Sequence, residues 1–240
     1  MQANRAISVI IPCWHDHAAL AALLARLNGL AQRARQQLQL LVVDAANSPE
    51  CQRICNQLGA QWLASAPCRG QQLRQGAAQA QHSILWFLHA DAQLLGNPLL
   101  DVQAVMSNGA VGGFFAFRFA GPSCWQSRVL ERLIGWRNRF GTPYGDQGLF
   151  VDRSAYLACG QHSPWPLFEE VDLINNLRGL GDFQRIEHGL LVDPRRWQRD
   201  GWWRRSLSNR LLALAHACGV SAFTLARLYQ RGHGPHSLKP

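Results

Sequence analysis

Acidic side chains that could bind a cation follow two apolar runs of this sequence. Asp44 ends VVD at 42–44, and Asp91 ends FLHAD at 87–91. A single aspartate after a strand often only caps the next helix. Two of them at strand ends in one parallel sheet favour a binding site, because ligands gather at the carboxyl ends of such strands.

A second acidic feature could transfer a proton. Glu169 and Glu170 are adjacent and precede a helical stretch. Acidic residues are favourable in the first turn of any helix, so position alone does not make the pair catalytic. Two neighbouring carboxylates at a helix start cannot both face one point. We expect one to face a reacting group and the other to face solvent or an arginine.

The elements that would position these carboxylates alternate between strand and helix in the first ninety residues. Short apolar runs predict strands at 6–12, 38–43, 61–64 and 83–88. Helical spacing of leucines after Asp16 predicts the first helix, and 49–58 and 69–81 predict two more. Strands that are apolar on both faces and joined by helices imply a parallel sheet covered on both sides. The predicted fold class is therefore α/β.

The second half of the chain is less regular. Predicted strands lie at 112–119, 149–151, 183–186 and 190–192, and predicted helices at 122–140 and 169–180. Residues 142–148 (TPYGDQG) are typical of a loop.

Composition and charge limit the class of protein. The chain has 240 residues, 48% of them apolar and 16% charged, which is enough for one compact domain with a buried core. The net charge is +9, and residues 195–240 carry nine basic and one acidic side chain. A protein that coats nucleic acid would spread its charge along the whole contact, so no specific nucleic acid is expected as a partner. A basic module that binds nucleic acid or an anionic membrane stays an alternative, because six arginines lie between Arg195 and Arg210.

Cysteine usage and the first residues indicate the compartment. Seven cysteines without a CxxC pair favour free thiols in a reducing environment. Cys51 and Cys55 are four residues apart on a predicted helix without a His or Cys partner nearby, so no metal site is predicted there. Residues 1–5 are polar and lead straight into the first strand, so we expect no secretory signal and a cytoplasmic protein.

The C-terminal region raises the question of a membrane. Residues 211–226 are uncharged, but this stretch is short for a bilayer span and contains His216 and Gly219. We expect a helix over 201–230 that packs on the domain, followed by a flexible tail at 231–240. The alternative is a helix lying on the inner face of the membrane, with Trp202 and Trp203 at its head.

Seven segments occur in one order over residues 6–230: ISVIIP at 7–12, VVD at 42–44, RGQQLRQGAA at 69–78, FLHAD at 87–91, GDQGLFV at 145–151, PLFEEVDL at 166–173 and RRW at 195–197. This order resembles the family 2 glycosyltransferases of the GT-A fold. It is most similar to a small bacterial subgroup found beside radical-SAM and selenium-related genes. The resemblance implies a Rossmann-like, mostly parallel sheet flanked by helices, with a C-terminal helical segment. It implies one domain over 1–230, with a nucleotide-binding half (1–120), an acceptor half (121–200) and a C-terminal helix (201–230).

The resemblance also implies a reaction. A nucleotide diphosphate sugar, with a UDP-sugar favoured, would donate its sugar to an acceptor hydroxyl that the sequence does not identify. Asp44 would contact the nucleoside, and Asp91 would bind the Mg²⁺ or Mn²⁺ that bridges to the diphosphate. Glu170, supported by Glu169, would remove the acceptor proton while the anomeric configuration inverts.

Further donor contacts are implied on three segments. Arginine forks suit phosphate oxygens, an indole can pack against a sugar, and the loop around 146 would lie near the sugar or acceptor. The residues are Arg69 and Gln72, Asp146 and Gln147, and Arg195, Arg196 and Trp197.

The sequence departs from the family pattern at three points. Residues 44–50 (DAANSPE) lack the glycines and second aspartate of the family's DGGSxDGT, Ala92 replaces a common threonine, and the acidic pair is Glu-Glu instead of Glu-Asp. An inactive relative is therefore an alternative to an active transferase. A sugar-phosphate nucleotidyltransferase is disfavoured, because residues 13–16 (CWHD) are not the glycine-rich basic loop of that class.

Overall fold

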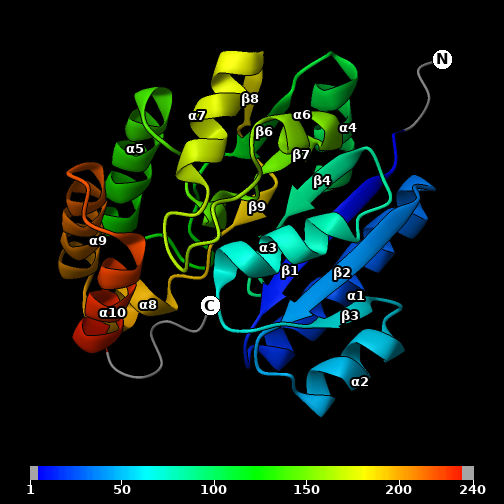
Figure 1. Ribbon diagram of the computed structural model, residues 1–240, viewed down its shortest axis with the longest axis horizontal. Helices are drawn as coiled ribbons and strands as arrows, with labels where there is room; N and C mark the ends of the chain where they lie inside the picture. The colour runs from blue at the N-terminus through cyan, green and yellow to red at the C-terminus, as the bar shows by residue number, and fades with distance from the viewer. Residues whose placement is uncertain (1–4, 234–240) are drawn as a thin grey trace.

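A seven-stranded sheet forms the centre of the computed structural model, which describes residues 5–233 (Figure 1). The strand order is β3-β2-β1-β4-β7-β6-β8. Neighbours from β3 to β4 are parallel, as are β6 and β8, whereas β7 is antiparallel to β4 and β6. The predicted α/β fold with a mostly parallel sheet is confirmed. The strands are β1 (Ile7–Cys13), β2 (Leu38–Asp44), β3 (Gln61–Ala64), β4 (Ile84–Phe87), β6 (Gly112–Phe115), β7 (Phe150–Asp152) and β8 (Phe183–Ile186).

Helices cover both faces of the sheet because its central strands are apolar on both sides. Val9 and Ile11 of β1 belong to a core shared with α1, α2 and α4, whereas Ile10 faces a second core with α3, α6 and α7. The helices of the first core are α1 (His17–Ala34), α2 (Pro49–Gln57) and α4 (Pro98–Ser107). Those of the second are α3 (Arg69–Ala78), α6 (Arg153–Ala158) and α7 (Val171–Leu180).

A helical layer lies beside the sheet and completes the fold (Figure 1). It consists of α5 (Trp125–Phe140), α8 (Arg195–Asp200), α9 (Trp202–Ala217) and α10 (Ala222–His233). An apolar cluster of Phe117, Phe119, Leu130 and Trp197 joins α5 to α8. A short antiparallel ribbon of β5 (Gln93–Leu94) and β9 (Leu190–Leu191) leads the chain into this layer.

The C-terminal region differs from its prediction. Residues 201–230 do not form one helix, because α9 ends at Ala217 and α10 begins at Ala222. Between them Gly219 has φ +89°, a left-handed conformation that ends a helix, and Ser221 accepts from the N–H of Thr224 at the start of α10. The predicted flexible tail is helical through His233, and residues 234–240 lie outside the described residues. None of the helices within residues 5–233 combines the length and apolar character that crossing a membrane requires.

Other differences concern short elements. The strand predicted at 112–119 ends at Phe115, and helices α4, α6 and α8 were not predicted. Their sequences are too short, or their apolar residues too irregular, to show a period.

Candidate active site

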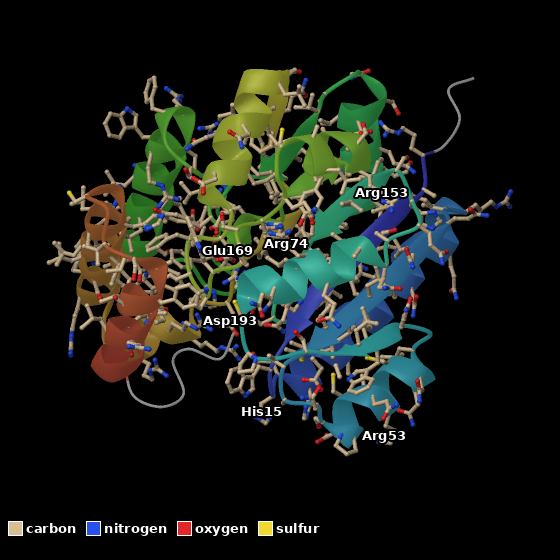
Figure 2. All side chains as sticks on the ribbon, viewed as in Figure 1. His15, Arg53, Arg74, Arg153, Glu169 and Asp193 are labelled. Atoms are coloured by element: carbon tan, nitrogen blue, oxygen red, sulfur yellow. The ribbon has the colours of Figure 1, made fainter. Side chains whose placement is uncertain are left out.

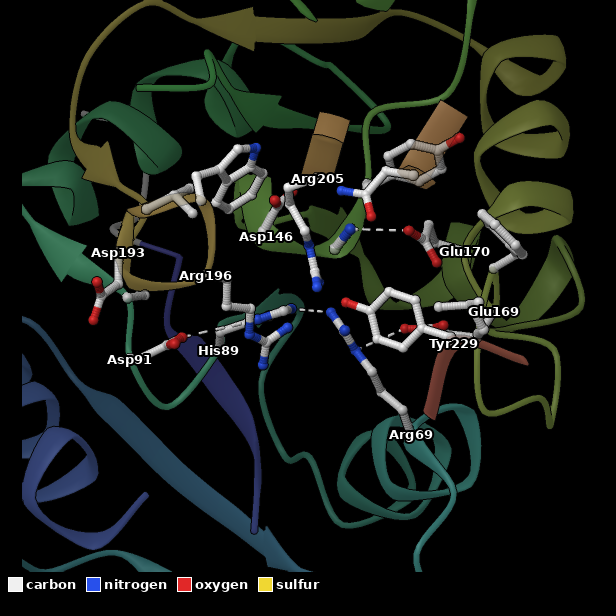
Figure 3. Close-up of a pocket in the computed structure, with 18 of the residues that line it drawn as sticks. Arg69, His89, Asp91, Asp146, Glu169, Glu170, Asp193, Arg196, Arg205 and Tyr229 are labelled. Carbon is white, nitrogen blue, oxygen red and sulfur yellow. Dashed lines mark hydrogen bonds and ion pairs between the residues drawn. The ribbon is translucent and has the colours of Figure 1, made fainter. Parts of the chain in front are cut away.

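A pocket of about 160 Å³ lies where the carboxyl end of β4 meets the helical layer (Figure 3). Figure 2 places the labelled Glu169 and Asp193, which both line it, near the middle of the molecule. The lining comes from the start of α3, the segment after β4, the loops before β7 and α7, the segment after β9, and helices α8 to α10. Seven of the eleven residues predicted for the site line this pocket: Arg69, Asp91, Asp146, Glu169, Glu170, Arg196 and Trp197.

The acidic pair is buried, and its two members have different partners. Oε1 of Glu169 lies 2.8 Å from Nε of Arg69. Oε1 of Glu170 accepts a 2.9 Å hydrogen bond from the backbone N–H of Gly145, whereas its Oε2 has no hydrogen-bond partner within residues 5–233. Burial, reinforced by the charge of Glu169, raises the pKa of Glu170 to about 8. Glu170 therefore contributes one anchored and one unengaged oxygen to the site.

The loop before α7 holds the pair in place. Phe168 has φ +61°, so the backbone turns sharply just before Glu169. The Phe168 ring stacks on His216 of α9 with ring centroids 4.7 Å apart. The backbone carbonyl of Glu169 accepts from the N–H of Ser163 at 2.8 Å. The helical layer thus fixes the loop that carries the two carboxylates.

Arg69 reaches the pocket because α3 packs closely against that loop. The N–H of Gly70 donates to the carbonyl of Trp165 at 2.9 Å, and a Cβ at position 70 would lie 2.0 Å from the carbonyl oxygen of Ser163. Only glycine permits this approach. Nη2 of Arg69 contacts Nε2 of His89. Burial, with the charges of Arg69 and Arg196, lowers the pKa of His89 well below its ordinary value, so the ring is neutral and Nε2 accepts from the guanidinium.

Asp91 is part of a cluster in which three carboxylates surround one guanidinium. Oδ2 of Asp91 accepts from Nη2 of Arg195 at 2.7 Å, and the same nitrogen lies 3.3 Å from Oδ1 of Asp16. Nε of Arg195 lies 3.7 Å from Oδ2 of Asp193. Asp91 and Asp193 line the pocket (Figure 3), whereas Arg195 is not among its lining residues. Carboxylate oxygens that already surround a cation form a donor set suited to Mg²⁺ or Mn²⁺.

Arginine side chains of α8 and α9 line the pocket and make it positively charged on that side. Arg196 lines the pocket and forms no ion pair within residues 5–233. Burial, together with repulsion from Arg195 and Arg69, lowers the pKa of Arg196 more than the attraction of Asp91 raises it. Arg205 is only 2% exposed, donates to Oδ2 of Asp200 at 3.1 Å and lies 4.8 Å from the ring centre of Tyr229. Burial and the charge of Arg196 lower the pKa of Arg205 to about 10.

The loop around residue 146 is held from behind by Gln147. Gln147 is fully buried, donates to the carbonyl of Phe115 at 3.0 Å and accepts from Nδ2 of Asn138 at 3.0 Å. Gln147 does not line the pocket, whereas its neighbour Asp146 does. Gln147 therefore positions the loop that carries Asp146. Burial raises the pKa of Asp146, against the opposing charge of Arg137.

Asp44 and Gln72, predicted to contact the nucleotide, do not line this pocket. Both are fully buried. Asp44 accepts from the backbone N–H groups of Ala46 (2.9 Å) and Ser48 (2.7 Å) and from the indole of Trp62 (3.3 Å). Gln72 donates to the carbonyl of Val43 at 2.7 Å. In this structure they stabilise the end of β2, and a contact with the nucleoside stays a prediction.

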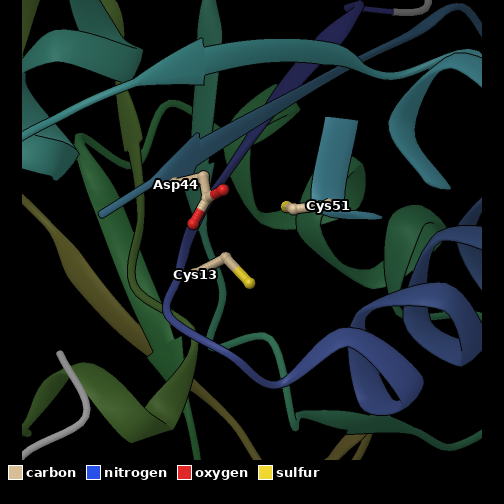
Figure 4. A group of neighbouring side chains, drawn as sticks. All are labelled: Cys13, Asp44 and Cys51. Carbon is tan, nitrogen blue, oxygen red and sulfur yellow. The ribbon is translucent and has the colours of Figure 1, made fainter. Parts of the chain in front are cut away.

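Two cysteines lie beside Asp44, the last residue of β2 (Figure 4): Cys13, the last residue of β1, and Cys51 of α2. The sulfur atoms of Cys13 and Cys51 and a carboxylate oxygen of Asp44 lie within 4.8 Å of one another. The sequence-based expectation that Cys51 has no partner was wrong, because β1 brings Cys13 to it from a distant position. Thiols suit softer metals than Mg²⁺ or Mn²⁺, so the carboxylates of the pocket fit those ions better. The seven cysteines carry free thiols, as predicted.

The lining residues that the predicted site does not contain include His89, Asp193, Arg205 and Tyr229. His89 lies inside the FLHAD segment and Asp193 lies two residues before RRW, so their proximity to these segments was the available signal. Arg205 belongs to the basic segment that follows the predicted diphosphate contacts Arg195 and Arg196, whereas no pattern indicated that Tyr229 of α10 would reach the site.

Comparison with known proteins identifies the family of this chain. Residues 8–159 match the family described as Glycosyl transferase family 2. Comparison with curated proteins finds no match. The assignment to a subgroup beside radical-SAM genes stays a prediction.

Solved structures share the fold at low sequence identity. Mannosyl-3-phosphoglycerate synthase from Rubrobacter xylanophilus is 17% identical with a TM-score of 0.59, over 96% of this chain and 76% of that one. A mannosyltransferase from Pyrobaculum calidifontis, solved with GDP-Man and Mn²⁺, is 15% identical with a TM-score of 0.63, over 92% of this chain and 66% of that one. Glucosyl-3-phosphoglycerate synthase from Mycobacterium tuberculosis, solved with phosphoglyceric acid, is 17% identical with a TM-score of 0.55, over 78% and 72%. This chain therefore spans just under two thirds of the Pyrobaculum protein and about three quarters of the other two.

Proposed function

The chain belongs to glycosyl transferase family 2, and from this premise we propose that it moves a sugar from a nucleotide diphosphate sugar to an acceptor hydroxyl, inverting the anomeric carbon. The observation that carries the proposal is the asymmetry of the acidic pair. Arg69 pairs with Glu169, while Oε2 of Glu170 is unengaged at the pocket.

Glu170 is the proposed general base. The Gly145 amide fixes Oε1, so Oε2 is the atom available to accept the acceptor proton. A raised pKa makes the ionised carboxylate a stronger proton acceptor, and a positioned base of this kind contributes about 10²–10⁴-fold to a rate. Glu169 supports it by fixing Arg69 at the edge of the pocket.

Asp91 is the proposed ligand of Mg²⁺ or Mn²⁺, with Asp193 as a second oxygen donor on the same side. The fit comes from the donor set, because both carboxylates already surround the guanidinium of Arg195. A divalent ion there would neutralise charge on the leaving diphosphate. The Mn²⁺ in the Pyrobaculum mannosyltransferase supports this choice of ion.

Arg196 is the proposed diphosphate contact, because it lines the pocket and no carboxylate within residues 5–233 pairs with it. Its planar fork suits phosphate oxygens. Arg195, predicted for the same role, would reach a diphosphate only after leaving Asp91. Trp197 lines the pocket and donates from its indole to Oγ of Ser206 at 3.2 Å, so it closes the site from α8.

A screen of donors tests this function. The purified chain is mixed with UDP-, GDP- and TDP-sugars, with and without Mn²⁺, and followed by thermal shift and by mass spectrometry of released nucleotide. UDP-sugars are the predicted donors, and the GDP-Man of the Pyrobaculum protein makes GDP-sugars the next class to test. Stabilisation should require nucleotide and metal together, by RT ln(1 + [L]/Kd). Absence of any stabilisation or donor cleavage across the panel would overturn the proposal.

A further inference from the structure

A second cavity, of about 470 Å³, lies between α5 and α9. Leu130, Leu133 and Ile134 line it from α5, and Trp203, Leu207 and Ala213 line it from α9. We call it the α5–α9 groove. Its walls are mainly apolar, so water molecules in the groove would find few hydrogen-bond partners. A hydrocarbon chain in the groove would bury apolar surface, which is favourable.

The α5–α9 groove adjoins the candidate active site. Tyr144, Asp146, Trp197 and Asn209 line both the groove and the catalytic pocket. A molecule that lies in the groove therefore has one end at Asp146, in the loop whose Gly145 amide anchors Glu170.

The junction carries positive charge. Arg137, Arg204 and Arg210 line the α5–α9 groove, and Asp146 is the one acidic residue among the lining side chains. Arg137 has neutral partners: it donates to Oδ1 of Asn138 at 3.0 Å and lies 4.5 Å from the ring centre of Tyr144. A guanidinium near Tyr144 without a carboxylate partner in the described structure is a ready contact for an anionic group.

The outer faces of the same two helices are apolar and basic. The exposed apolar side chains include Trp136 and Phe140 on α5 and Leu211 on α9. Trp203 and Leu207 are exposed as well and lie at the mouth of the α5–α9 groove, which they also line. Trp125 and Trp203 bring the helices together, with ring centroids 5.6 Å apart. Figure 1 shows α5 and α9 side by side at the edge of the molecule, away from the sheet. Exposed aromatic and leucine side chains interspersed with arginines suit the surface of an anionic membrane.

We propose that the acceptor is a membrane lipid whose head group carries a phosphate and a free hydroxyl, drawn from a bilayer that contacts the outer faces of α5 and α9. Its hydrocarbon chain lies in the α5–α9 groove, its phosphate at Arg137 and Arg210, and its hydroxyl at Glu170. The hydroxyl oxygen bonds to the anomeric carbon, the bond from that carbon to the diphosphate breaks, Oε2 of Glu170 takes the hydroxyl proton, and the nucleoside diphosphate leaves. This inference rests on the proposed function for its chemistry, whereas membrane contact is independent of it.

Membrane contact is tested by sedimenting the full chain with vesicles of phosphatidylcholine alone or mixed with phosphatidylglycerol. Binding should require the anionic lipid and weaken with salt, because each arginine near the surface is worth about fivefold in affinity. The double variant Leu133→Ser and Leu207→Ser should lose about tenfold or more. The matched control is Leu157→Ser with Leu180→Ser, on α6 and α7, whose exposures of 54% and 52% resemble the 47% and 61% of the test pair. Equal binding by both double variants would overturn the proposal.

The acceptor is tested with the donor found in the screen. Transfer should yield an organic-soluble product from the mixed vesicles, and Arg137→Gln should reduce that transfer about tenfold while donor-dependent thermal shift stays unchanged. Transfer only to water-soluble phosphates such as glycerol phosphate would overturn the proposal. So would a lipid-free dimer that the variant Leu133→Ser with Leu207→Ser converts to a monomer, because a second copy would then cover the face. Failure of the proposed function looks different, since no donor would then shift the melting temperature.

Discussion

Nε of Arg69 lies 2.8 Å from Oε1 of Glu169, and this ion pair gives two adjacent, chemically identical residues different surroundings. One glutamate is neutralised by a guanidinium that also contacts His89. The other has one anchored oxygen and one unengaged oxygen in a buried setting. The same side-chain type can therefore serve for positioning at 169 and for proton transfer at 170.

Substitution of each glutamate by glutamine should separate these two roles. Glu170→Gln removes the proton acceptor with little change in shape, so we expect turnover to fall about 10²–10⁴-fold with donor affinity unchanged. Glu169→Gln leaves Arg69 without its charged partner, so its main effect should be a lower melting temperature and weaker donor binding. Steady-state kinetics and donor titration on both variants check this. If Glu169→Gln abolished turnover with a normal melting temperature, the assignment would have to be reversed.

The pH dependence of stability should expose the raised pKa of Glu170. A carboxyl with a folded-state pKa near 8 and an ordinary unfolded-state value holds a proton only in the folded state between those values. The folded state then binds more protons, so its stability falls as pH rises through this window. Glu170→Gln lacks this penalty. Its melting temperature relative to wild type should therefore increase from pH 5 to pH 9, by roughly 2–4 °C for each kcal/mol.

Transfer by the wild type should respond to pH in the opposite sense. The base acts only when ionised, so the single-turnover rate should rise with pH toward a plateau above the pKa of Glu170. A rate that stays flat from pH 6 to pH 9 would contradict a base with this environment. Scanning calorimetry and single-turnover rates on the same buffers give both profiles.

Much of the fold follows from the sequence because apolar runs determine the parallel strands. The run at 61–64 has the bounds of β3, and the run at 38–43 lies within β2. The reversed direction of β7 could not be predicted, since a three-residue strand carries no sign of its direction. The break at Gly219 between α9 and α10 was also missed, because one glycine in an apolar stretch does not by itself end a helix.

The candidate site was predicted in part for a similar reason. Sequence order identifies which residues belong to the site, but it does not say which way each one faces. Arg195 and Arg196 were assigned the same role, yet successive residues of a helix point about 100° apart, so only Arg196 lines the pocket. Gln147 likewise faces the interior while its neighbour Asp146 faces the pocket.

Two glycine substitutions should distinguish a steric requirement from helix propensity. Gly70→Ala places a Cβ 2.0 Å from the carbonyl oxygen of Ser163, and backbone atoms cannot move aside cheaply. We expect a loss of about 1–3 kcal/mol and a large drop in turnover, because α3 would shift Arg69 away from the acidic pair. Gly29→Ala on α1 is the matched control, with nothing within 4 Å of the new Cβ, and should gain up to about 1 kcal/mol. Urea denaturation and kinetics measure both. Normal turnover in Gly70→Ala would show that the approach of α3 is not needed.

Competition between Arg195 and a divalent ion for Asp91 should be measurable without any donor. The guanidinium lies 2.7 Å from Oδ2 of Asp91, an oxygen that the ion is proposed to bind. Mn²⁺ must therefore displace a favourable ion pair, and removing that pair should make the ion bind more tightly. We expect Arg195→Gln to bind Mn²⁺ several-fold more tightly than wild type, and Asp91→Asn to bind it at least tenfold more weakly. Electron paramagnetic resonance of free Mn²⁺ gives these affinities independently of activity.

The control for this competition is Arg199→Gln on the same helix, because Arg199 pairs with Asp200 and not with Asp91. It removes the same charge from α8, so an unchanged Mn²⁺ affinity in Arg199→Gln would separate direct competition from a general change in potential. Once donor and Mn²⁺ are both present, Arg195 is free to reach the diphosphate, and its removal should then weaken donor binding. Arg195→Gln should thus tighten the binding of Mn²⁺ when no donor is present and weaken the binding of the donor when Mn²⁺ is present. Weaker Mn²⁺ binding in the donor-free Arg195→Gln variant would mean that Arg195 holds the carboxylates in place for the ion, and competition would be ruled out.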